Sequence, residues 1–244
     1  NAIGTYKTAY AAMMNGCKRF VLISTDKAVN PTNIMGASKR LCEMVVQMMD
    51  RRCPETNFVA VRFGNVLGSN GSVVPLFKKQ LANGGPLTVT HKEITRFFMT
   101  IPEACRLVME AATMTTGNQI FVFDMGESIK IDDLARRMIQ LAGFTPDVDI
   151  KVEYTGLRPG EKLYEELLTK KEDILPTYHK KIYIAKTEVV NSEEIDNCME
   201  ELQTILSENK EAQDLDIVRN IKRLVKTFKS NNSVYEELDN TNEK

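Results

Sequence analysis

The stretch that decides the fold runs from Phe20 to Arg40 and reads FVLISTDK at residues 20–27 and NPTNIMGASKR at residues 30–40. Four apolar residues end abruptly in a polar run, which predicts a buried parallel strand with polar side chains at its carboxyl end. Open α/β sheets bind their ligands at that edge. Apolar residues then recur with helical spacing, so the next helix should carry Met35 and Lys39 on one side. We therefore expect a functional site where this strand ends.

Composition limits the possible classes of protein. The 244 residues suffice for one large domain or two small ones, and the hydrophobic and charged fractions, 43% and 27%, are those of a globular protein. A net charge of −1 and the lack of a dense basic run argue against nucleic acid as a partner. No apolar run of about 18 residues and no signal peptide occurs, so we expect a soluble chain on the cytoplasmic side.

The cysteines and histidines give no sign of a metal or a nucleophilic site. The five cysteines are scattered without a Cys-x-x-Cys pair, which favours reduced, structural thiols in a cytosolic compartment. His91 and His179 lie far apart without clustered ligands. Neither a zinc site nor a Ser-His-Asp triad is therefore expected.

Residues 24–27 and 30–40 together resemble a known family. They are similar to the extended short-chain dehydrogenase/reductase enzymes that act as nucleotide-sugar 4,6-dehydratases in polysaccharide and glycan biosynthesis. Most of that superfamily carries Tyr-x-x-x-Lys on this helix, whereas Met35 stands at the tyrosine position here. This resembles the UDP-N-acetylglucosamine 4,6-dehydratases with methionine there, which are often membrane-anchored through N-terminal helices. The resemblance implies NAD as cofactor, a UDP-sugar substrate and a homo-oligomeric full-length protein.

The resemblance also implies roles for the residues at the strand end. Asp26 would be the acid that protonates the leaving C6 hydroxyl, and Lys27 the base that removes the C5 proton. Thr25 would hydrogen-bond the C4 oxygen or relay its proton. Because the thioether of Met35 cannot carry a proton near neutral pH, acid–base chemistry would fall to these neighbours.

Three positions are expected to contact the cofactor. By resemblance, Lys39 would hold the nicotinamide ribose, and Ser24 and Phe63 would be further cofactor-binding residues. The sequence contains no Gly-x-Gly-x-x-Gly loop to receive a pyrophosphate. Since residues 1–15 read as the helix just before the catalytic strand, we expect a missing N-terminal half of the catalytic domain as a partner.

Four later residues resemble the family's nucleotide-sugar contacts. Asn65 follows the next predicted strand, residues 57–63, and would bind substrate. Arg96 would face the diphosphate, which suits a forked and permanently charged guanidinium; an ion pair is its alternative role. In the Arg-Pro-Gly-Glu run, Arg158 would meet the diphosphate and Glu161 the ribose hydroxyls.

The expected architecture is α/β: the C-terminal portion of an extended Rossmann-type parallel sheet, a small α/β substrate-binding subdomain and a C-terminal helical tail. Residues 1–66 and 101–125 would form the partial NAD-binding domain, and residues 67–100 and 126–187 the nucleotide-sugar-binding subdomain. Residues 188–244 would be the tail. Its expected parts are two amphipathic helices, residues 192–207 and 214–229, and a polar end that frays.

Two other functions remain open. A nucleotide-sugar epimerase or reductase of the same superfamily would share Lys39 and Arg158 but would normally need tyrosine at position 35. A non-catalytic UDP-sugar-binding fragment would retain the substrate contacts without holding NAD by itself.

Overall fold

The computed structural model describes residues 1–168, 174–187, 189–207 and 213–242. The chain forms two compact units. Unit 1 comprises Asn1–Phe63, Leu107–Asp124 and Glu166–Lys244, and unit 2 comprises Gly64–Arg106 and Met125–Glu165. Among the described residues, no helix has the length and apolar character needed to span a bilayer.

A five-stranded sheet in the order β1-β2-β7-β11-β10 lies at the centre of unit 1. Strands β1 (Arg19–Ile23), β2 (Asn57–Arg62) and β7 (Gln119–Phe123) are parallel to one another. Strand β11 (Ile182–Ala185) is antiparallel to β7, and β10 (Ile174–Pro176) is antiparallel to β11. The continuous apolar runs of β2 and β7 are almost fully buried, as expected for a parallel sheet covered on both faces. The predicted α/β fold class is confirmed.

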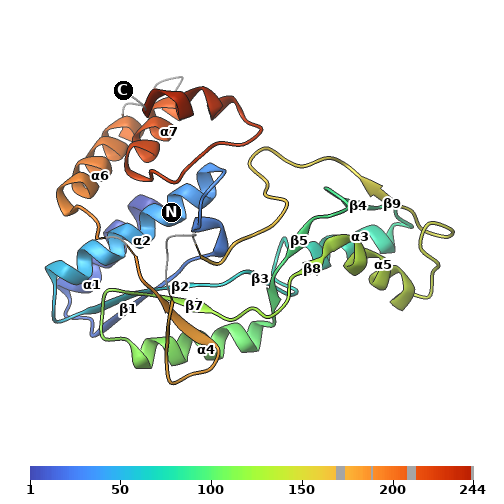
Figure 1. Ribbon diagram of the computed structural model, residues 1–244, viewed down its shortest axis with the longest axis horizontal. Helices are drawn as coiled ribbons and strands as arrows, with labels where there is room; N and C mark the ends of the chain where they lie inside the picture. The colour runs from blue at the N-terminus through green and yellow to red at the C-terminus, as the bar shows by residue number, and fades with distance from the viewer. Residues whose placement is uncertain (169–173, 188, 208–212, 243–244) are drawn as a thin grey trace. The chain divides into compact units, whose positions relative to one another are not determined.

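Helices cover both faces of this sheet. Figure 1 shows α1 (Ala2–Met14), α2 (Ile34–Arg52), α6 (Ser192–Ser207) and α7 (Gln213–Leu224) on one face, and α4 (Ile101–Met114) on the other. The side chain of Asn33 caps α2 by accepting a hydrogen bond from the amide of Gly36 at 2.9 Å. The apolar side of α2 enters the main core, where it meets side chains of α1, α6 and α7.

The C-terminal segment contributes side chains to this core. Helix α7 ends before residue 225, and a 3₁₀ helix, Val234–Asn242, occupies the stretch predicted to fray. That helix is docked by the buried side chain of Leu238 and by an ion pair between Lys222 and Asp239. The polar composition of this stretch conceals these long-range contacts.

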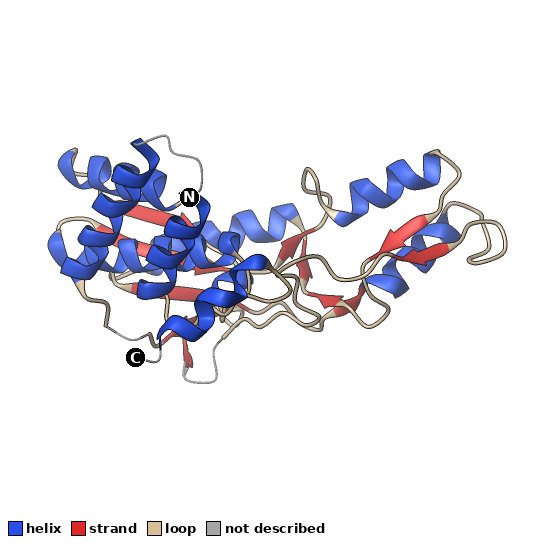
Figure 2. Ribbon diagram, turned by 90° about the horizontal axis from the view of Figure 1, so that it is seen from above, coloured by secondary structure: helices blue, strands red, loops and turns tan. Residues whose placement is uncertain are grey.

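Unit 2 is built from short strand pairs and two helices (Figure 2). Strand β3 (Asn65–Val66) pairs with β6 (Phe98–Met99), β4 (Leu87–Val89) with β9 (Val152–Tyr154), and β5 (Thr95–Arg96) with β8 (Ile129–Lys130). Helices α3 (Val73–Ala82) and α5 (Ile131–Leu141) pack against β4. Their shared core contains Phe77, Ile94, Ile131 and Ile139.

The two units differ in extent from the predicted domains. The prediction puts residues 166–187 with the sugar-binding subdomain and treats residues 188–244 as a separate tail, yet both belong to unit 1. The pairing of β11 with β7 is the physical reason, because it joins segments far apart in sequence and leaves no local signal. Residues 101–106 fall in unit 2 although the prediction puts them with the Rossmann part.

Candidate active site

The turn Thr25–Lys27 is fixed by the strand beside it. Beyond the end of β1, the amide of Ser24 donates to the carbonyl of Val61 at 2.8 Å, and the amide of Asp26 donates to the carbonyl of Phe63 at 3.1 Å. A single 3₁₀ turn follows, capped by the side chain of Thr25. The backbone of β2 thus determines where the polar side chains at the end of β1 are placed.

Three consecutive side chains are linked within this turn. Asp26 is fully buried, and its Oδ1 accepts hydrogen bonds from Thr25 Oγ1 at 2.8 Å and from Lys27 Nζ at 2.9 Å. Its Oδ2 is buried and has no hydrogen-bond partner among the described residues. Burying a carboxylate is costly, and an oxygen left without a donor in the core is unusual. The structure therefore brings together the three residues predicted for acid–base chemistry.

The first turn of α2 packs tightly against the same turn of chain. A Cβ added at Gly36 would lie 2.2 Å from the carbonyl oxygen of Lys27 and 3.2 Å from Pro31. Such a distance is far inside van der Waals contact, so only glycine lets the helix approach this closely. Gly36 thereby sets the distance between α2 and the Thr25–Lys27 turn.

Replacing Gly36 by alanine is expected to destabilise the protein by about 1–3 kcal/mol, because the backbone of Lys27 or α2 must move. Gly4→Ala is the matched control: Gly4 also lies in a helix, α1, and its added Cβ would meet nothing within 4 Å. Urea denaturation of both variants measures the difference. Equal midpoints for the two variants would contradict the close-packing argument.

The two predicted residues on α2 lie near the carboxyl end of β1. Lys39 Nζ donates to the carbonyl oxygen of Ile23 at 3.1 Å. Met35, one turn earlier, is 43% exposed and does not belong to the buried core. An exposed thioether at the start of α2 is compatible with a ligand-facing position.

The two other predicted cofactor residues face inward in unit 1. Ser24 is 4% exposed and donates its hydroxyl to Glu43 Oε1 at 2.6 Å. The ring of Phe63 stacks on that of Phe123, with centroids 5.6 Å apart and planes 4° from parallel. A contact between either side chain and a cofactor stays a prediction.

Three of the four predicted substrate residues meet in unit 2. Arg96 is 8% exposed and contacts Glu161 at 3.3 Å and Glu165 at 3.7 Å. Glu161 also accepts a hydrogen bond from the amide of Arg158 at 3.1 Å. The Arg158 side chain is exposed and forms no ion pair within the described ranges. Asn65 lies in β3, where its amide donates to the carbonyl of Phe97 at 2.9 Å.

These positions separate the two predicted sets of residues. The acid–base and cofactor residues all belong to unit 1, and the substrate-binding residues all belong to unit 2. Within unit 2, Arg96 has the ion-pair role that the sequence left as its alternative. Arg158 is therefore the more accessible cation of the two.

Sequence reasoning missed two charged residues beside the turn. Glu43 is fully buried on α2, and Arg62, 1% exposed, ends β2 and pairs with it at 2.7 Å. Two signals could have revealed them. Arg62 is the one charged residue of the apolar strand NFVAVR, and Glu43 follows Lys39 by one helical turn.

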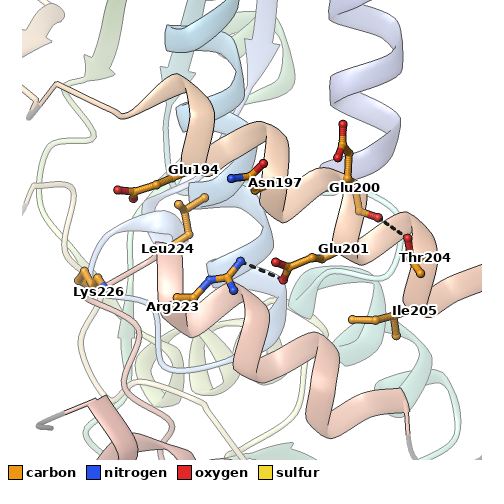
Figure 3. Close-up of a pocket in the computed structure, with 9 residues that line it drawn as sticks. All are labelled: Glu194, Asn197, Glu200, Glu201, Thr204, Ile205, Arg223, Leu224 and Lys226. Atoms are coloured by element: carbon orange, nitrogen blue, oxygen red, sulfur yellow. Dashed lines mark hydrogen bonds and ion pairs between the residues drawn. The ribbon is translucent and has the colours of Figure 1, made fainter.

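A surface pocket of about 810 Å³ lies on α6 and α7 (Figure 3). Arg223 projects into it and pairs with Glu201 at 2.9 Å, and Glu194 and Glu200 extend from the facing helix. None of the residues predicted for catalysis or binding lines this pocket. It therefore adds nothing to the candidate active site.

The chain is similar in sequence to the capsular polysaccharide biosynthesis protein CapD of Staphylococcus aureus. It is 52% identical over 210 residues, which cover 86% of this chain and 35% of CapD. The chain thus spans about a third of that relative's length.

Two solved structures share the fold. Pen from Bacillus thuringiensis has a TM-score of 0.69 and 36% identity, with 78% of this chain and 59% of Pen covered. The dTDP-glucose 4,6-dehydratase of Bacillus anthracis str. Ames, solved in complex with NAD, has a TM-score of 0.59 over 69% of this chain and 58% of its own. At 16% identity, the second structure supports the fold alone.

The family comparison covers most of the chain. The sequence profile described as polysaccharide biosynthesis protein matches residues 1–187. This range includes all the residues predicted for acid–base chemistry, for cofactor contact and for substrate binding. Together with the parallel sheet and its Rossmann-like neighbours, the match identifies the chain as a member of the polysaccharide biosynthesis protein family with the extended short-chain dehydrogenase/reductase fold.

Proposed function

We propose that the protein is a nucleotide-sugar 4,6-dehydratase that converts UDP-N-acetylglucosamine to a UDP-4-keto-6-deoxy sugar. The observation that carries the proposal is the ion pair between the buried Asp26 and the partly exposed Lys27 at the end of β1, with Met35 at the start of the adjoining helix. Elimination of water from a 4-keto sugar needs a base at C5 and an acid at the C6 hydroxyl. A side chain of each kind is present.

The ion pair provides a route to the protonation states that elimination requires. With Asp26 ionised and Lys27 charged, neither group is in its working form. A proton that passes from Nζ to Oδ1 along the 2.9 Å hydrogen bond yields a carboxylic acid and a free amine. The amine can then remove the C5 proton, and the acid can protonate the departing hydroxyl.

Thr25 would complete the proton path. Its hydroxyl donates to Asp26 Oδ1 at 2.8 Å and can rotate to meet a substrate oxygen. We assign it the hydrogen bond to the C4 oxygen of the sugar, through which the C4 hydroxyl proton would pass to solvent during oxidation. Lys27 would return its proton to C5 when hydride reaches C6. Met35, which has no proton to transfer, would contribute shape rather than acid–base chemistry.

Part of an NAD site fits the residues present in unit 1. Lys39 lies at the carboxyl end of the parallel strands, and its ammonium group retains donors beyond the bond to Ile23. We propose that it binds the nicotinamide ribose. NAD, when bound, would supply the oxidation at C4 and the return of hydride to C6.

Product analysis tests the proposal. The whole protein that contains this chain is incubated with NAD and UDP-N-acetylglucosamine, and the sugar is analysed by mass spectrometry and NMR. A product lighter by one water, with a ketone at C4 and a methyl group at C6, is expected. A C4 epimer of unchanged mass would instead favour the epimerase alternative.

Truncating Arg158 to alanine is expected to weaken UDP binding about ten- to a hundredfold, because a charge-assisted hydrogen bond contributes about 1.5–3 kcal/mol. The proposal rests on its exposed guanidinium in unit 2. Arg137→Ala, which removes an exposed arginine from α5 of the same unit, is the control. Calorimetric titration of UDP compares the two variants. Unchanged affinity in Arg158→Ala would mean that Arg158 does not bind UDP and serves only the structure of its turn.

We also propose that β1 pairs with a further strand in the whole protein. In the described sheet β1 has β2 as its neighbour and is the least buried of the three parallel strands. An open edge of this kind can accept another strand. Residues 1–244 alone are therefore expected to bind NAD weakly, and the presumed N-terminal half, added as a separate polypeptide, should restore binding. Tight NAD binding by the chain alone, measured by calorimetry, would contradict this.

A further inference from the structure

A buried ionic cluster adjoins the Thr25–Lys27 turn. Arg62 contacts both carboxylate oxygens of Glu43, through Nε to Oε1 at 2.7 Å and through Nη2 to Oε2 at 2.8 Å. Arg40 donates to Oε2 at 2.9 Å. Ser24 completes the cluster by donating its hydroxyl to Oε1 at 2.6 Å. Ser24 is also the residue that immediately precedes the turn.

The carboxyl group of Glu43 is held in its ionised form. Burial by itself would raise its pKa, but the charge and hydrogen bonds of Arg62, with Arg40 and Ser24, outweigh burial and lower the pKa to about 2. Glu43 is therefore ionised throughout the neutral range. Its hydrogen bond to Ser24 is charge-assisted and belongs to the stronger kind.

Helix α2 contacts both ends of the catalytic turn. Lys39 binds the carbonyl of Ile23, and one helical turn later Glu43 binds the hydroxyl of Ser24. The close approach of Gly36, described above, fixes the other end. The carboxylate of Glu43 is bound by Arg62 of β2. Residues of both β2 and α2 therefore hold the turn in place.

We propose that Glu43 is a positioning residue for dehydration: acting through Ser24, it holds the Thr25–Lys27 turn in the geometry that proton transfer requires. This inference rests on the proposed function. Glu43 touches no reacting atom in this account. The hydroxyl of Ser24 is a link that can be removed while the ion pair between Glu43 and Arg62 stays intact.

The experiment compares Ser24→Ala with Ser24→Thr, which restores a hydroxyl, in the whole protein with NAD. Removing a charge-assisted hydrogen bond next to the turn is expected to lower kcat about tenfold while KM for UDP-N-acetylglucosamine stays constant. Ser24→Thr should recover part of the loss. Ser207→Ala, which removes an exposed hydroxyl from α6, is the control and should leave both constants unchanged.

A second variant separates positioning from folding. Glu43→Gln keeps an acceptor for the Ser24 hydroxyl but removes the negative charge opposite Arg62. Both the melting temperature and kcat are measured for every variant. A lower melting temperature with normal kcat for Ser24→Ala would overturn the inference, because it would show a structural role alone. No keto product from the unaltered protein would overturn the proposed function and this inference with it. If the unaltered protein forms the keto product and Ser24→Ala has the same kcat as the unaltered protein, only the inference about Glu43 is overturned.

Discussion

Replacing Asp26 by asparagine is expected to lower the turnover of UDP-N-acetylglucosamine by about a hundredfold or more, with little change in substrate binding. Asparagine has nearly the same shape and keeps an oxygen for the hydrogen bonds from Thr25 and Lys27, which are 2.8 and 2.9 Å long. It cannot donate a proton as an acid does. The loss should therefore appear in kcat rather than in KM or in stability.

Lys27→Ala should show a loss of similar size, because it removes the base proposed to act at C5. It also leaves the buried carboxylate of Asp26 without its ion-pair partner, so some loss of stability is expected. Lys7→Ala, on helix α1, removes a lysine outside the proposed site and is the control. Steady-state kinetics of the three variants decide the assignment, and near-normal kcat in both Asp26→Asn and Lys27→Ala would refute it.

The second large effect concerns the segment after residue 188, which the family profile does not cover. Deleting it is expected to prevent unit 1 from folding. The main core draws many side chains from this segment, among them Ile195, Met199, Leu202, Ile221 and Phe228. Each such buried side chain contributes about 1.5–3 kcal/mol. The combined loss from these five side chains alone is comparable to the stability of about 5–15 kcal/mol that is usual for a folded domain.

A point variant gives the same test without truncation. Phe228 is 4% exposed, and its ring centroid lies 4.1 Å from Lys222 Nζ. Phe228→Ala should destabilise the protein by about 3–5 kcal/mol. Val234→Ala, at a residue 76% exposed, should change stability by less than about 0.5 kcal/mol. Urea denaturation followed by circular dichroism measures both, and equal midpoints would show that the segment is peripheral.

Local sequence patterns were sufficient to predict the helices and the strand around the site. The run of apolar residues before Ser24 and the helical spacing after Asn33 predict β1 and α2 because both elements are specified by nearby residues. The helix predicted over residues 1–15 is confirmed as α1, Ala2–Met14, for the same reason.

Features that depend on distant partners could not be predicted in this way. The antiparallel pairing of β7 with β11 joins Phe123 to Ile182, far apart in the chain. The docking of Leu238 depends on one apolar side chain in a polar segment. The pairing of Arg96 with Glu161 and Glu165 likewise follows from the folding of unit 2. A motif specifies which side chains are available, and tertiary structure decides whether each is buried, paired or exposed.

The central claim is that Asp26 and Lys27 eliminate water between C5 and C6 and that the hydrogen taken from C4 returns to C6. The most direct measurement supplies UDP-N-acetylglucosamine labelled with deuterium at C4 to the whole protein with NAD and locates the label in the product by NMR. Deuterium in the C6 methyl group of a 4-keto sugar is the predicted result. Deuterium retained at C4 of a sugar with inverted C4 configuration would contradict the account and indicate an epimerase.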